Sequence, residues 1–301
     1  MYDVVIIGAG PAGLTAAVYA LRAEKSVLVI EKSTFGGQIT YSPKIENFPG
    51  FISLNGNELA DKMVEQVLNL GGEIEVGKVV SVENCKGFKR VLTADGETYE
   101  GKAVIIAVGV KHRMLGLEKE TQFVGEGISF CAVCDGAFYK GKTVAVIGGG
   151  NSALQEAIML SEGCEKVYVV QNLGFLTGEA KLAQILESKS NVEIILNTTV
   201  KSLLGESCLE GIEVTDEKGA GRTLVLDGLF IAIGLVPENG AFADHVSLTD
   251  GYITADEKCL TDTAGIFVAG DCRTKSVRQI TTAVADGATS ALAACRYIDS
   301  L

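Results

Sequence analysis

The hexapeptide CAVCDG places Cys131 and Cys134 three positions apart, with Asp135 directly after them. A pair with this spacing can supply half of a zinc site, close a structural disulfide or act as a redox dithiol. Zinc takes about four ligands, whereas the chain has no second such pair and only two histidines, His112 and His245. A structural disulfide across so short a loop removes little chain entropy. The spacing therefore favours a redox dithiol and no metal site.

The chemistry of a redox dithiol uses both sulfurs. One thiolate attacks the disulfide of a partner, and the second thiol resolves the mixed disulfide that forms. Two intervening residues keep the sulfurs of Cys131 and Cys134 close enough to close a ring. Asp135 can protonate a leaving thiolate or, alternatively, cap the next turn of the chain. The spacing does not decide which sulfur attacks.

A redox dithiol needs a source of electrons, and the N-terminal residues predict a site for a dinucleotide that could supply them. Residues 2–33 predict a buried strand, a glycine turn, a helix and a second strand that ends in an acid. Gly8 allows the tight turn, Gly10 lets the backbone approach a pyrophosphate, and Gly13 permits close packing of the helix. Glu31 follows at the spacing expected of a ligand for ribose hydroxyls. This stretch is a dinucleotide-binding unit.

The same unit occurs a second time at residues 142–173. A shift of 140 residues aligns the two stretches without a gap and lays the three glycine positions of the first on Gly148, Gly150 and Ala153. Strand-like runs also recur at 103–110 and 228–235. The chain therefore contains an internal duplication of a nucleotide-binding fold.

The C-terminal segment belongs to the first of the two repeats. Residues 265–271 predict a further strand, followed by a helix from about Thr281, and neither has a counterpart in the second repeat. The expected fold class is α/β, with two Rossmann-like, three-layer nucleotide-binding domains, the second inserted into the first. We expect the first domain at 1–116 and 245–301 and the inserted domain, which carries the redox pair, at 117–244.

Composition restricts the partners. The net charge of −12 argues against nucleic acid, which requires a basic face. The apolar runs are far shorter than the roughly 20 residues that span a bilayer, and a first strand from Tyr2 leaves no room for a leader. We expect a cytoplasmic protein with no membrane partner and reduced thiols. Small buried residues or incidental surface thiols are expected at Cys85, Cys164, Cys208, Cys259, Cys272 and Cys295.

Five motifs give the chain a resemblance to a known family. They are GAGPAGL (8–14), GGQIT (36–40), IENFPG (45–50), CAVCDG and GDCRTKSVRQITTAVADG (270–287). Their order and spacing resemble those of the low-molecular-weight thioredoxin reductases over essentially the whole chain. The resemblance implies FAD in the first domain, thioredoxin as the protein substrate and a homodimer.

The resemblance also implies roles for individual residues. Cys134 is expected to exchange electrons with FAD, Cys131 to attack thioredoxin and Asp135 to donate a proton. Asp271 is expected on the ribityl and pyrophosphate side of FAD, unless it caps a helix or turn, and Arg278 at the isoalloxazine ring, unless it is a solvated surface charge. The remaining residues expected at FAD are Ala12, Gly36, Gly37, Gln38, Asn47, Gly109, Gly270, Gln279 and Ile280. A helix near Thr281 would direct its positive end at the flavin.

The second nucleotide unit departs from the family pattern. The family has an acid in its glycine turn and, after the next strand, His-Arg-Arg with a third arginine four positions later. This chain has Asn151 in the turn, and the later positions hold Gln171, Asn172, Leu173 and Thr177. Loss of two or three charge-assisted contacts costs about 3–6 kcal/mol, or roughly two to four decades in affinity. Gln171 is also a weak substitute for the acid that NADH requires.

We therefore expect electrons from another donor. The chain resembles the ferredoxin-dependent flavin thioredoxin reductases, in which electrons pass from reduced ferredoxin through FAD to the disulfide and on to thioredoxin. A rotation of one domain would let the pair meet both reactants. An acidic ferredoxin requires a basic docking patch, for which the candidates, unless they form a solvated face, are Lys86, Lys89 and Arg90, or Lys111 and Arg113.

Three other functions remain open at this point. The first is an NADPH- or NADH-dependent thioredoxin reductase in which a residue such as Lys181 replaces the missing arginines. The second is an FAD dithiol oxidase that passes electrons to oxygen. The third is a flavin-bearing sensor whose second domain recognises another protein. The retained CAVCDG argues against the sensor, and also against the related enzymes that pass electrons between ferredoxin and NADP without such a pair.

Overall fold

A computed structural model describes all 301 residues and divides the chain into two units. Unit 1 comprises Met1–Lys111 and Val236–Leu301, and unit 2 is His112–Leu235. Both boundaries fall earlier in the chain than the positions expected from the sequence. The physical reason is that β7 (Val110–His112) and β16 (Leu235–Pro237) pair with each other as a two-stranded sheet. The two segments in which the chain passes between unit 1 and unit 2 are therefore strands.

Unit 1 contains a seven-stranded sheet in the order β3-β2-β1-β6-β5-β4, with β19 paired to the end of β6. Its strands β1, β2, β3, β6 and β19 run parallel, whereas β4 and β5 form an antiparallel extension. The strands are β1 (Tyr2–Ile7), β2 (Val27–Glu31), β3 (Glu73–Val76), β4 (Val79–Cys85), β5 (Phe88–Thr93), β6 (Thr98–Ile106) and β19 (Ile266–Val268). Continuous apolar runs build β1, β2 and β19 because both faces of the sheet are covered there.

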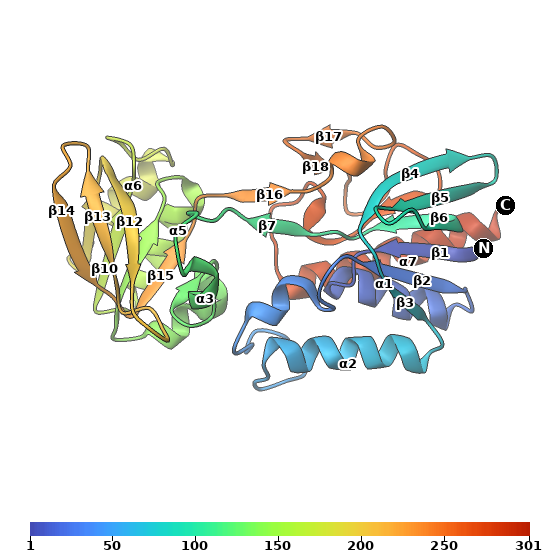
Figure 1. The fold of residues 1–301 in the computed structure, drawn as a ribbon, viewed down its shortest axis with the longest axis horizontal. Coiled ribbons are helices and arrows are strands. Elements are labelled where there is room, and N and C mark those ends of the chain that lie inside the picture. The colour runs from blue at the N-terminus through green and yellow to red at the C-terminus, as the bar shows by residue number, and fades with distance from the viewer. The chain divides into compact units, whose positions relative to one another are not determined.

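Alternate side chains of β1 enter two separate cores. Val4 and Ile6 pack with α1 (Pro11–Arg22) and α7 (Ile280–Asp299) on one face of the sheet. Val5 and Ile7 pack on the other face with residues of β4, β5 and the segment 242–272. Helix α2 (Gly56–Asn69) begins with a capping box between Asn55 and Glu58 and lies against α1. Figure 1 shows this three-layer arrangement.

Unit 2 repeats the plan. Its five-stranded parallel sheet has the order β11-β10-β9-β15-β8, whose first four members match β3-β2-β1-β6 of unit 1. The strands are β8 (Ile128–Ser129), β9 (Thr143–Ile147), β10 (Lys166–Val170), β11 (Val192–Ile195) and β15 (Gly228–Ile231). The helices are α3 (Glu120–Phe123), α4 (Ala132–Asp135), α5 (Asn151–Ser161) and α6 (Ala180–Glu187). The antiparallel sheet consists of β12 (Thr198–Leu204), β13 (Gly211–Asp216) and β14 (Gly221–Val225).

The predicted fold class is confirmed, because two Rossmann-like units share one topology and the second interrupts the first. Helix α7 begins at Ile280, one residue before the expected start. The short elements are η1 (Gly37–Tyr41), η2 (Gly136–Tyr139), η3 (Gly240–Phe242), η4 (Gly270–Cys272), β17 (Leu248–Thr249) and β18 (Tyr252–Ile253). None of the helices combines the length and the apolar composition needed to cross a membrane.

The contact between α1 and α7 generates a prediction. A Cβ atom on Gly287 of α7 would lie 2.2 Å from the carbonyl oxygen of Ala12 in α1. Overpacking of this kind costs about 1–3 kcal/mol, so Gly287→Ala should lower the midpoint of thermal unfolding by several degrees. Gly240→Ala is the control in the same unit, because nothing lies within 4 Å of its Cβ position. Equal midpoints for the two variants would contradict the close approach.

Candidate functional site

The predicted redox pair is formed in unit 2. Cys131 and Cys134 are joined as a disulfide, with their Cα atoms 5.3 Å apart. Cys131 is the N-cap of the single-turn helix α4, and the backbone N–H of Cys134 donates to its Sγ at 3.2 Å. The turn of α4 therefore brings the two sulfurs together, as the spacing predicted.

The remaining six cysteines are free. Cys164, Cys259, Cys272 and Cys295 are buried, Cys85 is partly buried and Cys208 is exposed. Burial raises the thiol pKa of all four buried cysteines, to about 12 for Cys259 and Cys272. These four thiols are poor nucleophiles because only the thiolate attacks.

A hydrogen-bonded chain links Asp135 to the redox pair. The Ser129 hydroxyl donates to Oδ2 of Asp135 at 2.6 Å and accepts the backbone N–H of Cys131 at 3.1 Å. The other carboxyl oxygen, Oδ1, is buried and has no hydrogen-bond partner. Burial raises the pKa of Asp135, although the bond from Ser129 opposes the rise. Asp135 therefore keeps its proton to a higher pH than an exposed aspartate does.

The glycine turn of unit 1 is open to a ligand. Gly10 is the N-cap of α1, no side chain caps that helix, and nothing lies within 4 Å of the Cβ position of Gly10. The carboxylate of Glu31 accepts the backbone N–H groups of Ala9 at 2.7 Å and Ser33 at 3.0 Å. Free N–H groups at the start of a helix favour an anion such as a pyrophosphate. The residues predicted to bind the dinucleotide thus surround an accessible turn.

The second part of the predicted cofactor site lies at η4. Oδ1 of Asp271 is buried and has no hydrogen-bond partner. Burial raises the pKa of Asp271 to about 6, against the opposing charges of Lys275 and Arg278. A buried polar atom without a partner is uncommon in proteins, and a hydroxyl of a ribityl chain would satisfy it. These residues therefore fit FAD.

The other predicted cofactor residues lie in the same unit. The Gln38 amide donates to the carbonyl of Val110. Asn47 donates from Nδ2 to Oε1 of Gln279 at 3.3 Å. Gln279 is the N-cap of α7, immediately before Ile280. Ala12, Gly36, Gly37, Gly109 and Gly270 also belong to unit 1. Their contacts with FAD stay predictions.

Arg278 is held in place by its neighbours. Its guanidinium lies 4.3 Å from the ring centre of Tyr252 and donates to the carbonyl of Asp271 at 3.3 Å. The side chain is only partly exposed. Arg278 is therefore packed next to η4 rather than fully solvated, and its contact with the isoalloxazine ring stays a prediction.

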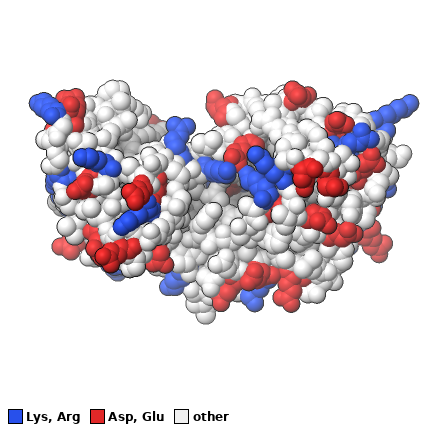
Figure 2. All heavy atoms as spheres, in the orientation of Figure 1, with Lys and Arg blue, Asp and Glu red and all other residues white.

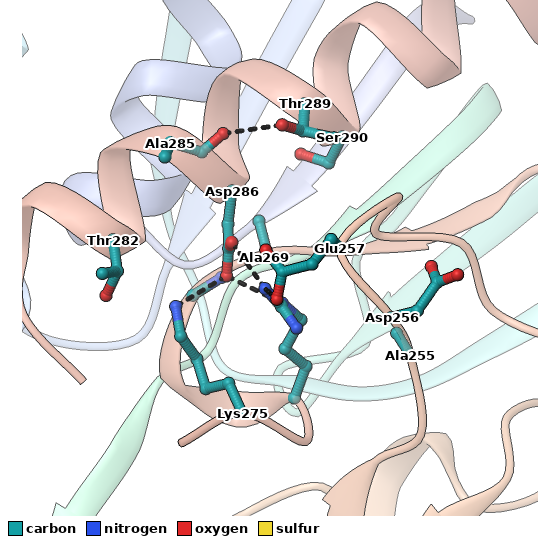
Figure 3. A network of polar contacts seen from close by, with 12 residues as sticks. Ala255, Asp256, Glu257, Ala269, Lys275, Thr282, Ala285, Asp286, Thr289 and Ser290 are labelled. Atoms are coloured by element: carbon teal, nitrogen blue, oxygen red, sulfur yellow. Dashed lines mark hydrogen bonds and ion pairs between the residues drawn. The ribbon is translucent and has the colours of Figure 1, made fainter. Parts of the chain in front are cut away.

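A buried ion cluster connects η4 to α7. Asp286 of α7 accepts from the backbone N–H of Gly270 at 3.0 Å, twice from Arg273 at 2.8 Å and from Nζ of Lys275 at 2.9 Å. Figure 3 shows Asp286 pointing from α7 toward Lys275. The side chain of Arg273 is 2% exposed, whereas its second partner, Glu257, is 93% exposed. Burial raises the pKa of Asp286, but the hydrogen bonds from Arg273 and Lys275 lower it below the ordinary value.

The glycine turn of unit 2 contacts the segment that follows β10. A Cβ on Gly149 would lie 2.4 Å from Nε2 of the buried Gln171. The backbone N–H groups of Thr177 and Gly178 both donate to the carbonyl of Gly149 at 2.8 Å. The turn of unit 1 has matching contacts, because Glu31 accepts the N–H of Ala9 and the N–H of Gly36 donates to the carbonyl of Ala9 at 2.7 Å.

The same segment places a carboxylate at the start of α5. Oδ1 of Asn151 accepts the backbone N–H of Glu179 at 2.7 Å, and its Nδ2 donates to Oε1 of Glu179 at 3.2 Å. An acidic side chain at the start of a helix occupies the environment that a phosphate would use. The loss of the nucleotide anchors in unit 2 stays a prediction.

The expected basic docking patch is partly wrong. Lys89 is only 4% exposed, and burial lowers its pKa. Arg90 pairs with Glu83 and Glu100, and Lys111 pairs with Glu238. On the face drawn in Figure 2, acidic and basic side chains lie among one another. The exposed candidates without such an ion pair are Lys86 and Arg113.

Sequence reasoning did not identify Ser129, the Asp286 cluster or Glu179. A lone serine or acid carries no spacing signal, because its partners come from distant positions in the chain. The motifs that do carry a spacing signal are the two glycine turns and CAVCDG.

Comparison with known proteins identifies a matching family and several similar proteins. Residues 2–287 match the family described as pyridine nucleotide-disulphide oxidoreductase. The thioredoxin reductase of Listeria monocytogenes is 42% identical over 309 residues, which cover 100% of this chain and 95% of that protein. A Clostridium pasteurianum protein named 34.2 kDa protein in rubredoxin operon is 40% identical over 298 residues, covering 98% and 97%. The crystal structure of thioredoxin reductase from Streptococcus pyogenes has a TM-score of 0.95, at 39% identity and coverage of 100% and 99%.

The Asp286 cluster generates a second prediction. Asp286→Asn leaves Arg273 and Lys275 buried without a counter-charge, and breaking a buried pair costs about 3–5 kcal/mol. We expect a lower unfolding midpoint and weaker retention of FAD on dialysis, because Asp286 also holds the N–H of Gly270. Glu257→Gln removes the exposed partner of Arg273 and should have little effect. A midpoint and a flavin content equal to those of the unaltered protein would show that the cluster does not support η4.

Proposed function

The chain belongs to the thioredoxin reductases, a group of FAD-dependent enzymes within the pyridine nucleotide-disulphide oxidoreductases. We propose that the electrons of this enzyme come from reduced ferredoxin or a similar one-electron carrier. The single observation that carries the choice of donor is the absence of a cation from the positions where the family's NADPH-binding arginines would lie.

Charge supports the same choice. NADPH requires cations for its 2′-phosphate, and bidentate arginines are the side chains best suited to that task. The positions expected to carry them hold Asn172, Leu173 and Thr177, all exposed to solvent and all uncharged. Glu179 adds a negative charge at the start of α5. The name of the Clostridium pasteurianum relative, which refers to a rubredoxin operon, is also consistent with a one-electron donor.

Residues of unit 1 would hold the cofactor. Gly10 and the start of α1 would receive the pyrophosphate, Glu31 a ribose and Asp271 a hydroxyl of the ribityl chain. FAD when bound supplies the ability to take up electrons singly and to deliver them in pairs. This property matches a one-electron donor to a disulfide, which takes up two electrons.

The redox pair and its neighbours would then reduce thioredoxin. The thiolate of Cys131 attacks one sulfur of the thioredoxin disulfide, which breaks the S–S bond and forms a mixed disulfide. Cys134 displaces the thioredoxin sulfur and restores the Cys131–Cys134 disulfide. Asp135, whose pKa burial raises, supplies the proton that the departing thiolate takes up. Ser129 orients the carboxyl through its 2.6 Å hydrogen bond. We also expect the family's homodimer, which light scattering can test.

A donor panel tests the proposal. In anaerobic stopped-flow measurements, reduced ferredoxin should bleach the flavin and drive thioredoxin reduction, whereas NADPH should act at least about a hundredfold more slowly, given the lost phosphate contacts. The reverse order would support the NADPH-dependent alternative. Peroxide release from a dithiol substrate without thioredoxin reduction would support the dithiol oxidase.

A gain-of-function variant sharpens this test. Asn172→Arg, Leu173→Arg and Thr177→Arg together restore three cations at exposed positions without changing the core. We expect faster flavin reduction by NADPH in this triple variant, and no gain when the same residues are changed to Gln. If the Gln variant gained as much, opening of the segment rather than phosphate recognition would be the cause.

Single cysteine variants test the order of the sulfurs. Cys134→Ser should accumulate a mixed disulfide between Cys131 and thioredoxin, because the resolving thiol is absent. Cys131→Ser should form no such adduct. Mass spectrometry of the trapped species identifies the joined cysteines, and an adduct at Cys134 would reverse the assignment.

A further inference from the structure

Glu156 places a second buried carboxyl against the redox segment. It lies on α5, which packs directly on α4. Ala132, the residue after Cys131, belongs to the same apolar cluster as Ala157 and Leu160 of α5. Glu156 therefore enters the interface between the two helices at the level of the CAVC segment.

One oxygen of this carboxyl lacks the environment of a surface glutamate. Oε2 is shut off from solvent and has no hydrogen-bond partner. The backbone N–H of Ala132 faces the carboxyl and favours its ionised form. Burial outweighs that contribution and raises the pKa of Glu156 to about 7.

No charged side chain compensates this burial. The titratable groups on the elements packed against α5 are Asp135 of α4, Tyr139 of η2, Lys166 and Tyr168 of β10, and Lys181 and Glu187 of α6. None of them contributes to the pKa of Glu156. Because the group has no ion-pair partner, it serves no salt bridge that would explain its position.

We propose that Glu156 is a positioning residue for the redox pair, whose carboxyl braces the backbone at Ala132 and holds a proton beside the Cys131–Cys134 segment. The proposal rests on the disulfide-reductase role given above to the two cysteines, and it is independent of the electron donor.

The reaction explains why a proton is useful there. Reduction of the disulfide breaks one S–S bond and adds two electrons and two protons to give two thiols, of which one loses its proton when it attacks thioredoxin. A neutral Glu156 leaves that thiolate unopposed, whereas an ionised one raises the thiol pKa by like-charge repulsion. Below about pH 7 the neutral carboxyl of Glu156 therefore leaves the attacking sulfur more reactive than the ionised carboxylate would.

Alkylation of the reduced protein measures this effect. The FAD-loaded protein is reduced with dithiothreitol, freed of it anaerobically and treated with iodoacetamide between pH 5.5 and 9, and mass spectrometry reports the rate at Cys131 and Cys134. The unaltered protein should show an additional ionisation near pH 7. Glu156→Gln, which keeps an acceptor for Ala132, should lose that ionisation and react about threefold faster at pH 8, equivalent to a thiol pKa lower by about half a unit.

Two further variants separate charge from structure. Glu162→Gln removes an exposed carboxylate at the end of the same helix, one that pairs with Lys189, and should leave the profile unchanged. Glu156→Leu removes the charge and the acceptor, so it should match Glu156→Gln in thiol pKa but reduce thioredoxin more slowly. A Glu156→Gln profile that superimposes on the unaltered one, or an equal shift from Glu162→Gln, would overturn the proposal. Because dithiothreitol replaces the donor, neither result depends on ferredoxin.

Discussion

The structure depends on how each repeat satisfies the free N–H groups at the start of the helix that follows its first strand. These groups need an acceptor, because a helix cannot satisfy its own first turn. In unit 1 the start of α1 carries no side-chain cap and remains accessible at Gly10. In unit 2 the start of α5 likewise carries no side-chain cap, and Asn151 of its first turn pairs with Glu179. The duplicated fold thus repeats an uncapped helix start in both units.

The Asp286 cluster supports η4, the second part of the cofactor site in the same unit as the open turn. Two cations share one carboxylate inside unit 1, and the desolvation of these charges is tolerated only because their hydrogen bonds are complete. The same carboxylate holds the backbone of Gly270. Asp271, the next residue, is left with an unpartnered oxygen. The cluster therefore fixes the backbone so that the adjoining side chain stays available for a ligand.

Sequence reasoning could predict the parts of this molecule that have a period or a spacing. The strand runs, the glycine turns and CAVCDG gave the fold class, the duplication and the redox pair. It could not find Ser129 or Glu156, because their roles depend on which side chains α4, α5 and β8 bring together. Lys89 was placed on a surface patch because a basic run is usually solvated, yet the alternation of β5 turns it inward. The unit boundaries moved because β7 and β16 pair only in the folded chain.

The two carboxyls at the redox segment show how burial alone can supply acid chemistry. Asp135 is linked to the pair through Ser129, and Glu156 faces the backbone at Ala132. Both pKa values rise chiefly because water is excluded from the carboxyl, without a neighbouring anion. Thiol–disulfide exchange produces and consumes thiolates, so an ionised carboxylate at the same place would oppose it. The packing of α4 on α5 thus gives α5 a structural role beside the redox pair that does not involve nucleotide binding.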